Sequence, residues 1–326
     1  NSNASMQEIL DVLFPQETPL KRMIALNLSG YEGSPPQKLC VHHNLDTLQY
    51  ILEGVLQEAQ NVNSPRAYAI FKGIKGGNAQ LPEKLAEHLA PNIHQNKVLK
   101  SVQRGQDHPI RLTFTDGTKA VCDKLILALP CSVYTDIDFD SSLIPPERLN
   151  QIQQVQYGSA AKIIIPANCP DRYWNFILGD AMSSFFNEDE KLLLMYFFEE
   201  SGAHLQANQT QLFEQGLKTL KRGYSQGSFN EAPAVIASDE SFAYYDQAVT
   251  RGWVEDPYAK GSYSNFGTAL KETFSKLTCY KGIWLKKLFE PIEDTLFFAG
   301  EHATITDTPG TMEAAVESGN HIVELF

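Results

Sequence analysis

Near its C-terminal end, the sequence combines residues whose order could create an anion-binding site. The apolar run at 296–299 predicts a buried strand, Gly300 predicts a turn after it, and a helical pattern begins at Thr311, just after Pro309-Gly310. The N–H groups of a first helical turn have no partner inside the helix, and the aligned peptide dipoles favour negative charge there. The pattern therefore indicates a candidate anion site, although this order of elements is common in α/β proteins.

A lysine interrupts the apolar run at 161–165. In an extended strand, Lys162 and Ile164 point to one face and their neighbours to the other. A lysine in this place either belongs to a functional site or blocks aggregation at the edge of a sheet. The pattern alone leaves both interpretations open.

Ser225 lies in a Gly-x-Ser-x-Gly pattern at 223–227, which is the signature of a serine hydrolase nucleophile elbow. That elbow requires a buried strand before the serine and a helix after it. Here the preceding residues follow a helical pattern, with Leu217 and Leu220 among charged residues. A serine hydrolase is therefore a minor alternative.

The residue types that bind metals do not show metal-binding spacing. No two of the five cysteines form Cys-x-x-Cys, and none of the eight histidines belongs to a His-Glu-x-x-His pattern. We therefore expect no metal centre and no disulfide framework. A reducing, cytoplasmic location fits this cysteine usage.

The chain has 326 residues, of which 43% are apolar, and a formal charge of −12. This size and content suit one large or two medium globular domains. The negative charge disfavours nucleic acid as a partner and permits cationic amines. No apolar stretch approaches the about 18 residues that a membrane helix needs, so we expect no membrane span.

Four segments carry the periodicity of helices. The first has an apolar stripe from 45 to 56, with Asn44 as a candidate N-cap, and ends before Asn61. The other three helices are expected around 81–89, after a glycine-rich break at 73–77, and around 212–220 and 270–277.

Strands are predicted in the middle of the chain. Apolar residues alternate with polar ones from Val98 to Phe114, where Asp116-Gly117 gives a hairpin turn signal, so we expect a β-meander. The almost continuous apolar run at 125–129 is typical of a strand that is buried on both faces in a central sheet.

Four separated motifs also follow one another in a recognisable order. They are Gly76-Gly77-Asn78 with Cys122-Asp123-Lys124-Leu125-Ile126-Leu127-Ala128-Leu129-Pro130, Gly158-Ser159-Ala160-Ala161-Lys162, Trp253 with Asp256-Pro257-Tyr258-Ala259-Lys260-Gly261-Ser262-Tyr263-Ser264, and Phe298-Ala299-Gly300-Glu301-His302 with Gly310-Thr311-Met312-Glu313-Ala314-Ala315-Val316-Glu317-Ser318-Gly319. With these motifs the chain resembles the flavin-containing amine oxidase superfamily, which includes monoamine oxidases, polyamine oxidases and flavin-dependent histone lysine demethylases. The fourth motif is the most specific.

The resemblance implies that FAD is the cofactor and that it is bound non-covalently. Ser262 stands where monoamine oxidases have the cysteine that attaches the flavin. The implied cofactor contacts are Val98 at the adenine, Gly300 and Glu301 at the ribityl chain and pyrophosphate, and Thr311, Met312 and Glu313 under the isoalloxazine ring.

The resemblance also implies three residues at the reacting atoms. Lys162 would hold a water against flavin N5, and Trp253 and Tyr263 would form an aromatic wall that orients the amine. The implied reaction is hydride transfer from the α-carbon of a neutral amine to the flavin. O₂ then reoxidises the flavin with release of H₂O₂. Two departures, Thr311 in place of a second cage tyrosine and Ala315 in place of a glycine, leave the particular amine open.

One expected feature of such an enzyme is absent from the sequence. No Gly-x-Gly-x-x-Gly follows a strand, and no acidic residue closes a βαβ unit for the adenosine ribose. We therefore expect a truncated form with an incomplete FAD-binding domain, which binds flavin weakly or not at all. The alternative is a non-catalytic binding module derived from the same fold.

The expected fold is mixed α/β with two interleaved domains. An incomplete Rossmann-like FAD-binding domain would comprise residues 73–137 and 258–326. A substrate-binding domain of mixed sheet and helices would comprise residues 6–72 and 138–257.

Overall fold

The computed structural model describes residues 4–60, 74, 76–106, 109–166, 177–179, 182–187, 191–226, 246–268, 271–306 and 308–326. These residues form helices together with several separate sheets, so the prediction of a mixed α/β fold is confirmed. Gly73, Cys169, Gly227 and Leu270, which entered the sequence interpretation, lie outside the described residues.

Three helices form the N-terminal part: α1 (Met6–Leu13), α2 (Pro19–Glu32) and α3 (Val41–Gln60). Ser5 caps α1 by accepting a hydrogen bond from the N–H of Glu8, and Thr18 caps α2 in the same way. Gly33 ends α2 with a φ of +62°, a left-handed conformation that glycine adopts without strain. The helices share a small apolar core formed by Met6, Leu10, Ile24, Leu28, Leu39, Leu48 and Ile51.

The predicted start of the third helix at Asn44 is wrong. The helix begins at Val41, and Asn44 is buried in its first turns, where its side-chain amide donates to the carbonyl of Cys40 at 2.7 Å. An asparagine side chain can bond a carbonyl four residues earlier inside a helix as well as cap its start, and the sequence pattern does not separate the two.

An antiparallel sheet of five strands has the order β11-β7-β10-β9-β8. Its strands are β7 (Ala160–Pro166), β8 (Ile177–Gly179), β9 (Met182–Asn187), β10 (Leu192–Phe198) and β11 (Val249–Gly252). Helix α6 (Glu199–Ala203) follows β10, and α7 (Leu205–Gln226) packs on one face of the sheet and contains the helix predicted around 212–220.

Strand β7 alternates as its sequence predicts. Ala161, Ile163 and Ile165 are buried in the core under α7, while Lys162 and Ile164 lie on the other face. The strand is internal, since β10 and β11 pair with its two sides. The interpretation of Lys162 as a charge that blocks a sheet edge is therefore wrong.

The predicted β-meander is confirmed. It consists of β1 (Leu99–Arg104), β2 (Ile110–Phe114) and β3 (Lys119–Cys122), and β5 (Asp138–Phe139) adds a parallel strand beside β1. Asp116 and Gly117 form the turn between β2 and β3, where Gly117 has a φ of +82°. The short helix before the meander is α4 (Gln80–Leu89), followed by the turn η1 (Ala90–Asn92).

A parallel pair joins the middle of the chain to its end: β4 (Leu125–Leu127) pairs with β15 (Leu296–Phe298). Helix α11 (Met312–Val323) follows, with Thr311 as its N-cap. The expectation that the 125–129 strand is buried on both faces is wrong, because Ile126 is 44% exposed. Among the described residues, no further strand pairs with β4 or β15 in this sheet.

The remaining elements connect these layers. They are η2 (Cys131–Asp136), α5 (Pro146–Gln153), β6 (Gln156–Tyr157), β12 (Ser264–Asn265), α10 (Lys271–Ser275), β13 (Leu277–Tyr280), β14 (Ile283–Lys286), η4 (Lys287–Phe289) and η5 (Glu301–Ala303). The helix expected at 270–277 is shorter than predicted, because Leu277 begins the hairpin of β13 and β14. A leucine at that spacing fits a helix stripe and a strand start equally well.

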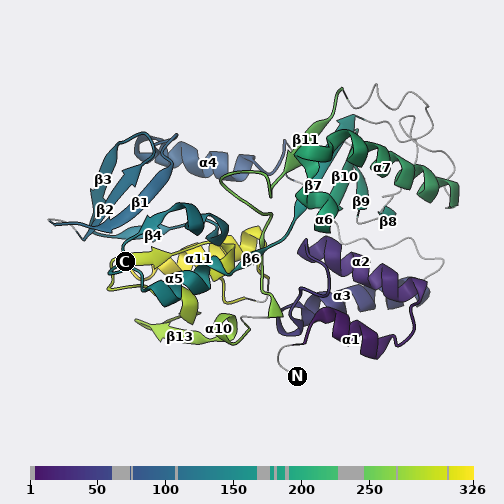
Figure 1. Cartoon of the computed structure of the whole chain (residues 1–326), viewed down its shortest axis with the longest axis horizontal. Helices are drawn as coiled ribbons and strands as arrows, with labels where there is room; N and C mark the ends of the chain where they lie inside the picture. Colours follow the sequence, from purple (N-terminus) through teal and green to yellow (C-terminus); the bar gives the residue numbers. More distant parts are fainter. Residues whose placement is uncertain are drawn as a thin grey trace.

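In Figure 1, the meander, β4, α5, β13 and the C-terminal helix α11 lie on one side of the molecule, and the five-stranded sheet lies on the other, above α1, α2 and α3. Helix α2 contacts β8 and β10 of that sheet. The strands β6 and β12 pair where the chain passes between the two sides. No helix in the described ranges is long and apolar enough to cross a bilayer.

Candidate active site

Lys162 is the centre of the first group of site residues. Its half-buried side chain extends from the face of β7 opposite the α7 core, between cross-strand neighbours Tyr196 on β10 and Arg251 on β11. Its Nζ lies 5.9 Å from the ring centroid of Tyr196 and 5.5 Å from that of Trp253. Both separations lie in the range of a cation–π interaction.

The environment of Lys162 favours its neutral form. No carboxylate of the described residues lies within ion-pair distance of its Nζ, so burial is not compensated by an opposite charge. Burial lowers the pKa of the Lys162 ammonium below its ordinary value of 10.5.

Tyr263 joins this group through Tyr196. The two phenol oxygens lie 3.4 Å apart, and the hydroxyl of Tyr263 donates to the carbonyl of Tyr31 at the end of α2. Burial raises the pKa of both Tyr196 and Tyr263, which keeps both phenols neutral. Lys162, Tyr196, Trp253 and Tyr263 are called the lysine–aromatic cluster below.

Gly33 and Gly158 allow three chain segments to pass close to one another beside Tyr263. These segments are the end of α2, the residues before β7 and the residues around Ser262. A Cβ added to Gly158 would lie 2.9 Å from the carbonyl oxygen of Glu32 and 2.9 Å from Ser262 Oγ, and one added to Gly33 would lie 3.4 Å from the Tyr263 hydroxyl. Ser262 Oγ is buried in this crossing without a hydrogen-bond partner. The crossing explains why a glycine precedes β7 and fixes the position of Tyr263.

The second group surrounds the turn after β15. Gly300 has a φ of +135°, and a Cβ there would lie 2.6 Å from His302 Cε1, so only glycine fits. The carboxylate of Glu301 accepts hydrogen bonds from Ser264 N (2.8 Å), Ser264 Oγ (2.6 Å) and Gly310 N (2.7 Å). The Glu301 side chain therefore fastens β12 to the start of α11, and only its backbone is left to approach a cofactor.

The start of α11 is open. Thr311 Oγ1 accepts from the N–H of Ala314 at 3.1 Å. The N–H groups of Met312 and Glu313 have no acceptor among the described residues, and both residues are exposed. The turn at Gly300 and Glu301 and the helix start from Gly310 to Glu313 are called the C-terminal turn below.

Tyr263 contacts both groups. A Cβ added to Gly310 would lie 3.0 Å from Cδ2 of the Tyr263 ring, and Gly310 has a φ of +81°. The structure thus joins Lys162, Trp253 and Tyr263 to the residues expected at the flavin ring. Val98 is not part of this arrangement: it precedes β1, and its carbonyl accepts from the N–H of Thr115 at 2.9 Å.

Sequence reasoning missed Tyr196, Tyr31 and Glu32. Tyr196 is one aromatic residue in the apolar run of β10, and nothing in that run separates it from its buried neighbours. Tyr31 and Glu32 end α2, where the sequence offered no motif. These residues reach the cluster only through long-range packing.

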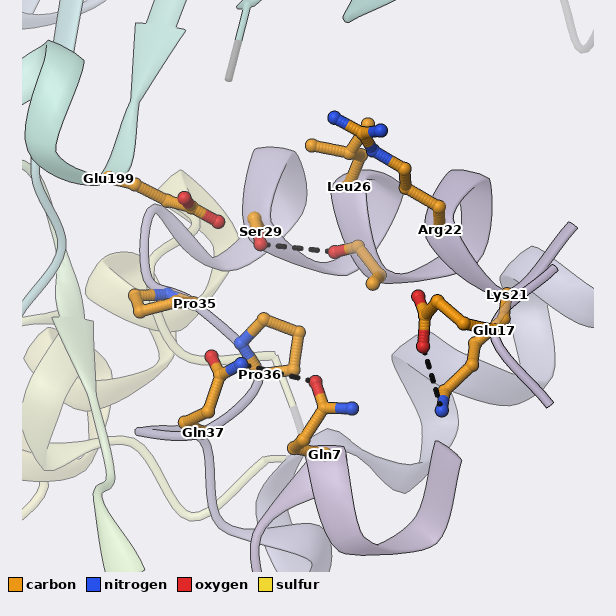
Figure 2. A pocket seen from close by; sticks show the side chains of 11 residues that line it. Gln7, Glu17, Lys21, Arg22, Leu26, Ser29, Pro35, Pro36, Gln37 and Glu199 are labelled. Carbon is orange, nitrogen blue, oxygen red and sulfur yellow. Dashed lines mark hydrogen bonds and ion pairs between the residues drawn. The ribbon is translucent and has the colours of Figure 1, made fainter. Parts of the chain in front are cut away.

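A pocket of about 240 Å³ lies elsewhere, between α1, α2 and the segment after α2 (Figure 2). Its wall includes Lys21, whose Nζ pairs with Asp11 at 2.7 Å and with Glu17 at 3.2 Å. None of the four residues of the lysine–aromatic cluster lines it. The charge of Lys21 is thus compensated within the protein.

The serine hydrolase alternative does not fit the structure. Ser225 lies near the C-terminal end of α7, with helix rather than strand before it, so the 223–226 segment is not a nucleophile elbow.

Across the described ranges, no group of three or more histidine, cysteine or acidic residues could hold a metal ion.

Comparison with known proteins places the chain in a wider context. The model of the family described as flavin containing amine oxidoreductase matches residues 4–324. An L-amino-acid oxidase from Pseudechis australis is 28% identical over 109 residues, which are 32% of this chain and 20% of that protein. The matched part thus spans one fifth of this relative's length.

Solved structures with a similar fold include two mutants of putrescine oxidase from a redesign of cofactor binding. For the triple mutant, the TM-score is 0.69 at 16% identity, and the match covers 99% of this chain and 67% of the mutant's chain. For the single mutant, the TM-score is 0.68 at 15% identity, and the match covers 99% of this chain and 68% of the mutant's chain. At this identity the likeness concerns the fold.

Proposed function

The chain belongs to the family of flavin containing amine oxidoreductases, and we propose that it forms the substrate wall and part of the flavin site of an FAD-dependent amine oxidase. The observation that carries the proposal is Lys162, which lies half-buried on an internal strand beside two aromatic rings. A half-buried lysine without a carboxylate partner among the described residues is unfavourable for folding, which is characteristic of a functional group.

The C-terminal turn fits a flavin. It follows the carboxyl end of β15, the edge at which α/β sheets bind ligands. Gly300 permits close approach of the backbone, and the N–H groups of Met312 and Glu313 would hold the negatively charged edge of the ring. Ser262 cannot form the thioether of a cysteine, so binding is non-covalent.

When bound, FAD supplies the acceptor for the hydride that leaves the α-carbon of the amine, and O₂ restores it with release of H₂O₂. The residues of this chain orient the amine and control protons. Trp253 and Tyr263 present their rings to the substrate, which stacking and the ring quadrupole align. Lys162, with its pKa lowered by burial, can hold a water or accept a proton at its Nζ.

A dinucleotide-binding βαβ unit completes this flavin site. The parallel pair of β4 and β15 supports this part of the proposal, because parallel strands normally belong to sheets with both faces covered. Ile126 on β4, Met312 and Val316 on α11, and Leu81 and Leu85 on α4 are all more than 40% exposed. Such apolar surface suits contact with further strands and helices.

The two domains of the proposed enzyme are interleaved. Residues 73–137 and 258–326 contribute to the FAD-binding domain, where Val98 would meet the adenine through its N–H. Residues 6–72 and 138–257 contribute the substrate-binding domain. The association of α2 with β8 and β10 supports grouping the first helices with the five-stranded sheet.

The test is the visible absorption spectrum of the protein after incubation with FAD and gel filtration. Retained flavin bands, followed by peroxide release with an amine, support the oxidase. A complete protein with its dinucleotide-binding unit that retains no flavin contradicts it and favours a non-catalytic binding module, the alternative that the missing Gly-x-Gly-x-x-Gly suggests.

A further inference from the structure

We propose that Met312 is a site of oxidative modification, where H₂O₂ converts the thioether to a sulfoxide and thereby weakens flavin binding. The inference rests on the amine oxidase function proposed above, because that reaction releases H₂O₂. A modification at this place would make the enzyme sensitive to its own product.

Met312 differs from the other methionines in exposure. The chain has five methionines, of which Met312 is 54% exposed and Met23 on α2 is 36% exposed. The other three, Met6, Met182 and Met195, belong to apolar cores and are at most 1% exposed. H₂O₂ in water reaches an exposed thioether, whereas close packing keeps it from a buried one. Met312 and Met23 are therefore the two accessible thioethers.

The position of Met312 in the fold separates it from Met23. Met312 is the first residue of α11 and follows Gly310, whose added Cβ would lie 3.0 Å from the ring of Tyr263. Tyr263 belongs to the lysine–aromatic cluster, where the amine would react. Met23 lies in the first half of α2 and belongs neither to that cluster nor to the C-terminal turn. Of the two accessible thioethers, only Met312 lies at the proposed flavin site.

The surroundings of Met312 suit an apolar side chain. Val316 lies one helical turn further along the same side of α11 and is also exposed. The N–H of Met312 would hold the edge of the flavin, so its side chain would lie against the cofactor or against the residues that complete the site. A thioether fits such a contact because it is apolar and polarisable. A sulfoxide is polar, and its burial there without a hydrogen-bond donor is unfavourable.

The chemical step needs no reactant besides H₂O₂. The sulfur of Met312 attacks one oxygen of the peroxide, so that the O–O bond breaks and an S–O bond forms. The sulfur loses two electrons and the peroxide gains them, and the second oxygen leaves as water with both protons. Methionine sulfoxide reductases reverse the change.

The first experiment treats the full chain with H₂O₂ and follows the oxidation of each methionine by peptide mass spectrometry. We expect Met312 and Met23 to be oxidised and the three buried methionines to remain intact. FAD at about ten times its Kd leaves about one chain in ten without ligand, so it should slow the oxidation of Met312 about tenfold. The oxidation rate of Met23 should not change, because bound flavin does not cover α2.

The second experiment measures the affinity for FAD by flavin fluorescence, before and after treatment with H₂O₂. We expect the affinity of the wild-type chain to fall about tenfold, as for one polar group buried without a partner. Methionine sulfoxide reductases should restore it. In Met312→Leu, which keeps an apolar side chain without a thioether, the affinity should not respond to H₂O₂. The matched control Met23→Leu should respond as the wild type does, which also separates the effect from oxidation of the exposed Cys279.

Three results overturn the inference. They are oxidation of Met312 no faster than that of the buried methionines, equal oxidation of Met312 with and without FAD, and an affinity for FAD that H₂O₂ leaves unchanged in the wild type or lowers equally in Met312→Leu. The proposed oxidase function fails separately. In that case FAD protects Met312 and the sulfoxide weakens its binding, yet no amine reduces the bound flavin or releases H₂O₂.

Discussion

The lysine–aromatic cluster and the C-terminal turn are built from different parts of the polypeptide. In the cluster, side chains from β7, β10 and the segments around Trp253 and Tyr263 contact one another, and the hydroxyls of Tyr196 and Tyr263 have protein partners. In the C-terminal turn, the groups that face outward belong to the backbone of Gly300, Met312 and Glu313. The first region is enclosed, and the second is open.

The difference shows which of the two regions the described residues hold in place by their own packing. Packing of the five-stranded sheet on α7 fixes the cluster without a ligand. The C-terminal turn follows a two-stranded parallel pair in which β15 is buried while Ile126 on β4 is exposed. Tyr263 and Glu301 connect the regions.

The largest effect is expected where the connection is strongest. Glu301→Ala removes the acceptor of three hydrogen bonds and leaves the N–H groups of Ser264 and Gly310 unpaired. We expect the free energy of unfolding to fall by about 3 kcal/mol or more. Urea denaturation measures this, with Glu324→Ala, an exposed acid after α11, as control. A loss no greater than in the control would show that the two regions are not joined through Glu301.

Lys162→Met separates function from stability in the cluster. The change keeps an unbranched side chain and removes a charge that burial disfavours, so stability should stay equal or increase. Flavin reduction by an amine should slow about 10²-fold, the lower range for loss of a proton-handling group. Stopped-flow reduction measures the rate, with Lys218→Met on the far side of α7 as control. An unchanged rate would remove Lys162 from the mechanism.

Gly158→Ala tests the crossing behind Tyr263. Its Cβ would approach the carbonyl of Glu32 to 2.9 Å, so the segments must separate. We expect a loss of about 1–3 kcal/mol, as for other overpacked sites. Gly54→Ala in α3 has nothing within 4 Å and should instead stabilise the helix by about 0.5–1 kcal/mol. Equal melting temperatures for the two variants would mean that the crossing is not tight.

The rate of flavin reduction should depend on pH, with an inflection at the pKa of Lys162. Because the pKa of Lys162 is lowered, its neutral form appears at lower pH than for an ordinary lysine, and the limiting rate should rise with pH through that lowered value. Stopped-flow rates at saturating amine measure the profile. Lys162→Met should lose this inflection, and its persistence in the variant would assign the inflection to another group.

The smallest effect is expected far from both regions. Ser225→Ala, near the end of α7, should leave flavin reduction unchanged within twofold. A peroxide-release assay measures this, and loss of an esterase activity in the variant would revive the hydrolase alternative.

Periodicity predicted the elements whose local sequence pattern is sufficient to identify them. The alternation at 161–165 and the Gly300 turn required no tertiary information. The errors at Asn44 and Leu277 arose where one residue type suits two local structures. The exposure of Ile126 could not be predicted, because it depends on which other elements cover β4.

The site residues also fall into those that a sequence motif predicted and those that only the folded structure reveals. Lys162, Trp253 and Tyr263 were predicted from the resemblance to a family, and the internal position of β7 removes the sheet-edge explanation of Lys162. Tyr196 and Glu32 were missed because their partners are distant in sequence. The turn of Gly300 and Glu301 was predicted from the resemblance, but the hydrogen bonds of the Glu301 carboxylate to Ser264 and Gly310 could be found only in the structure.

The most direct test of the account is anaerobic mixing of the FAD-loaded protein with an amine, followed by visible absorbance. The account predicts that the flavin band bleaches and that admission of O₂ restores it with release of H₂O₂. Protein-bound FAD that no amine reduces would contradict the assignment of an amine oxidase.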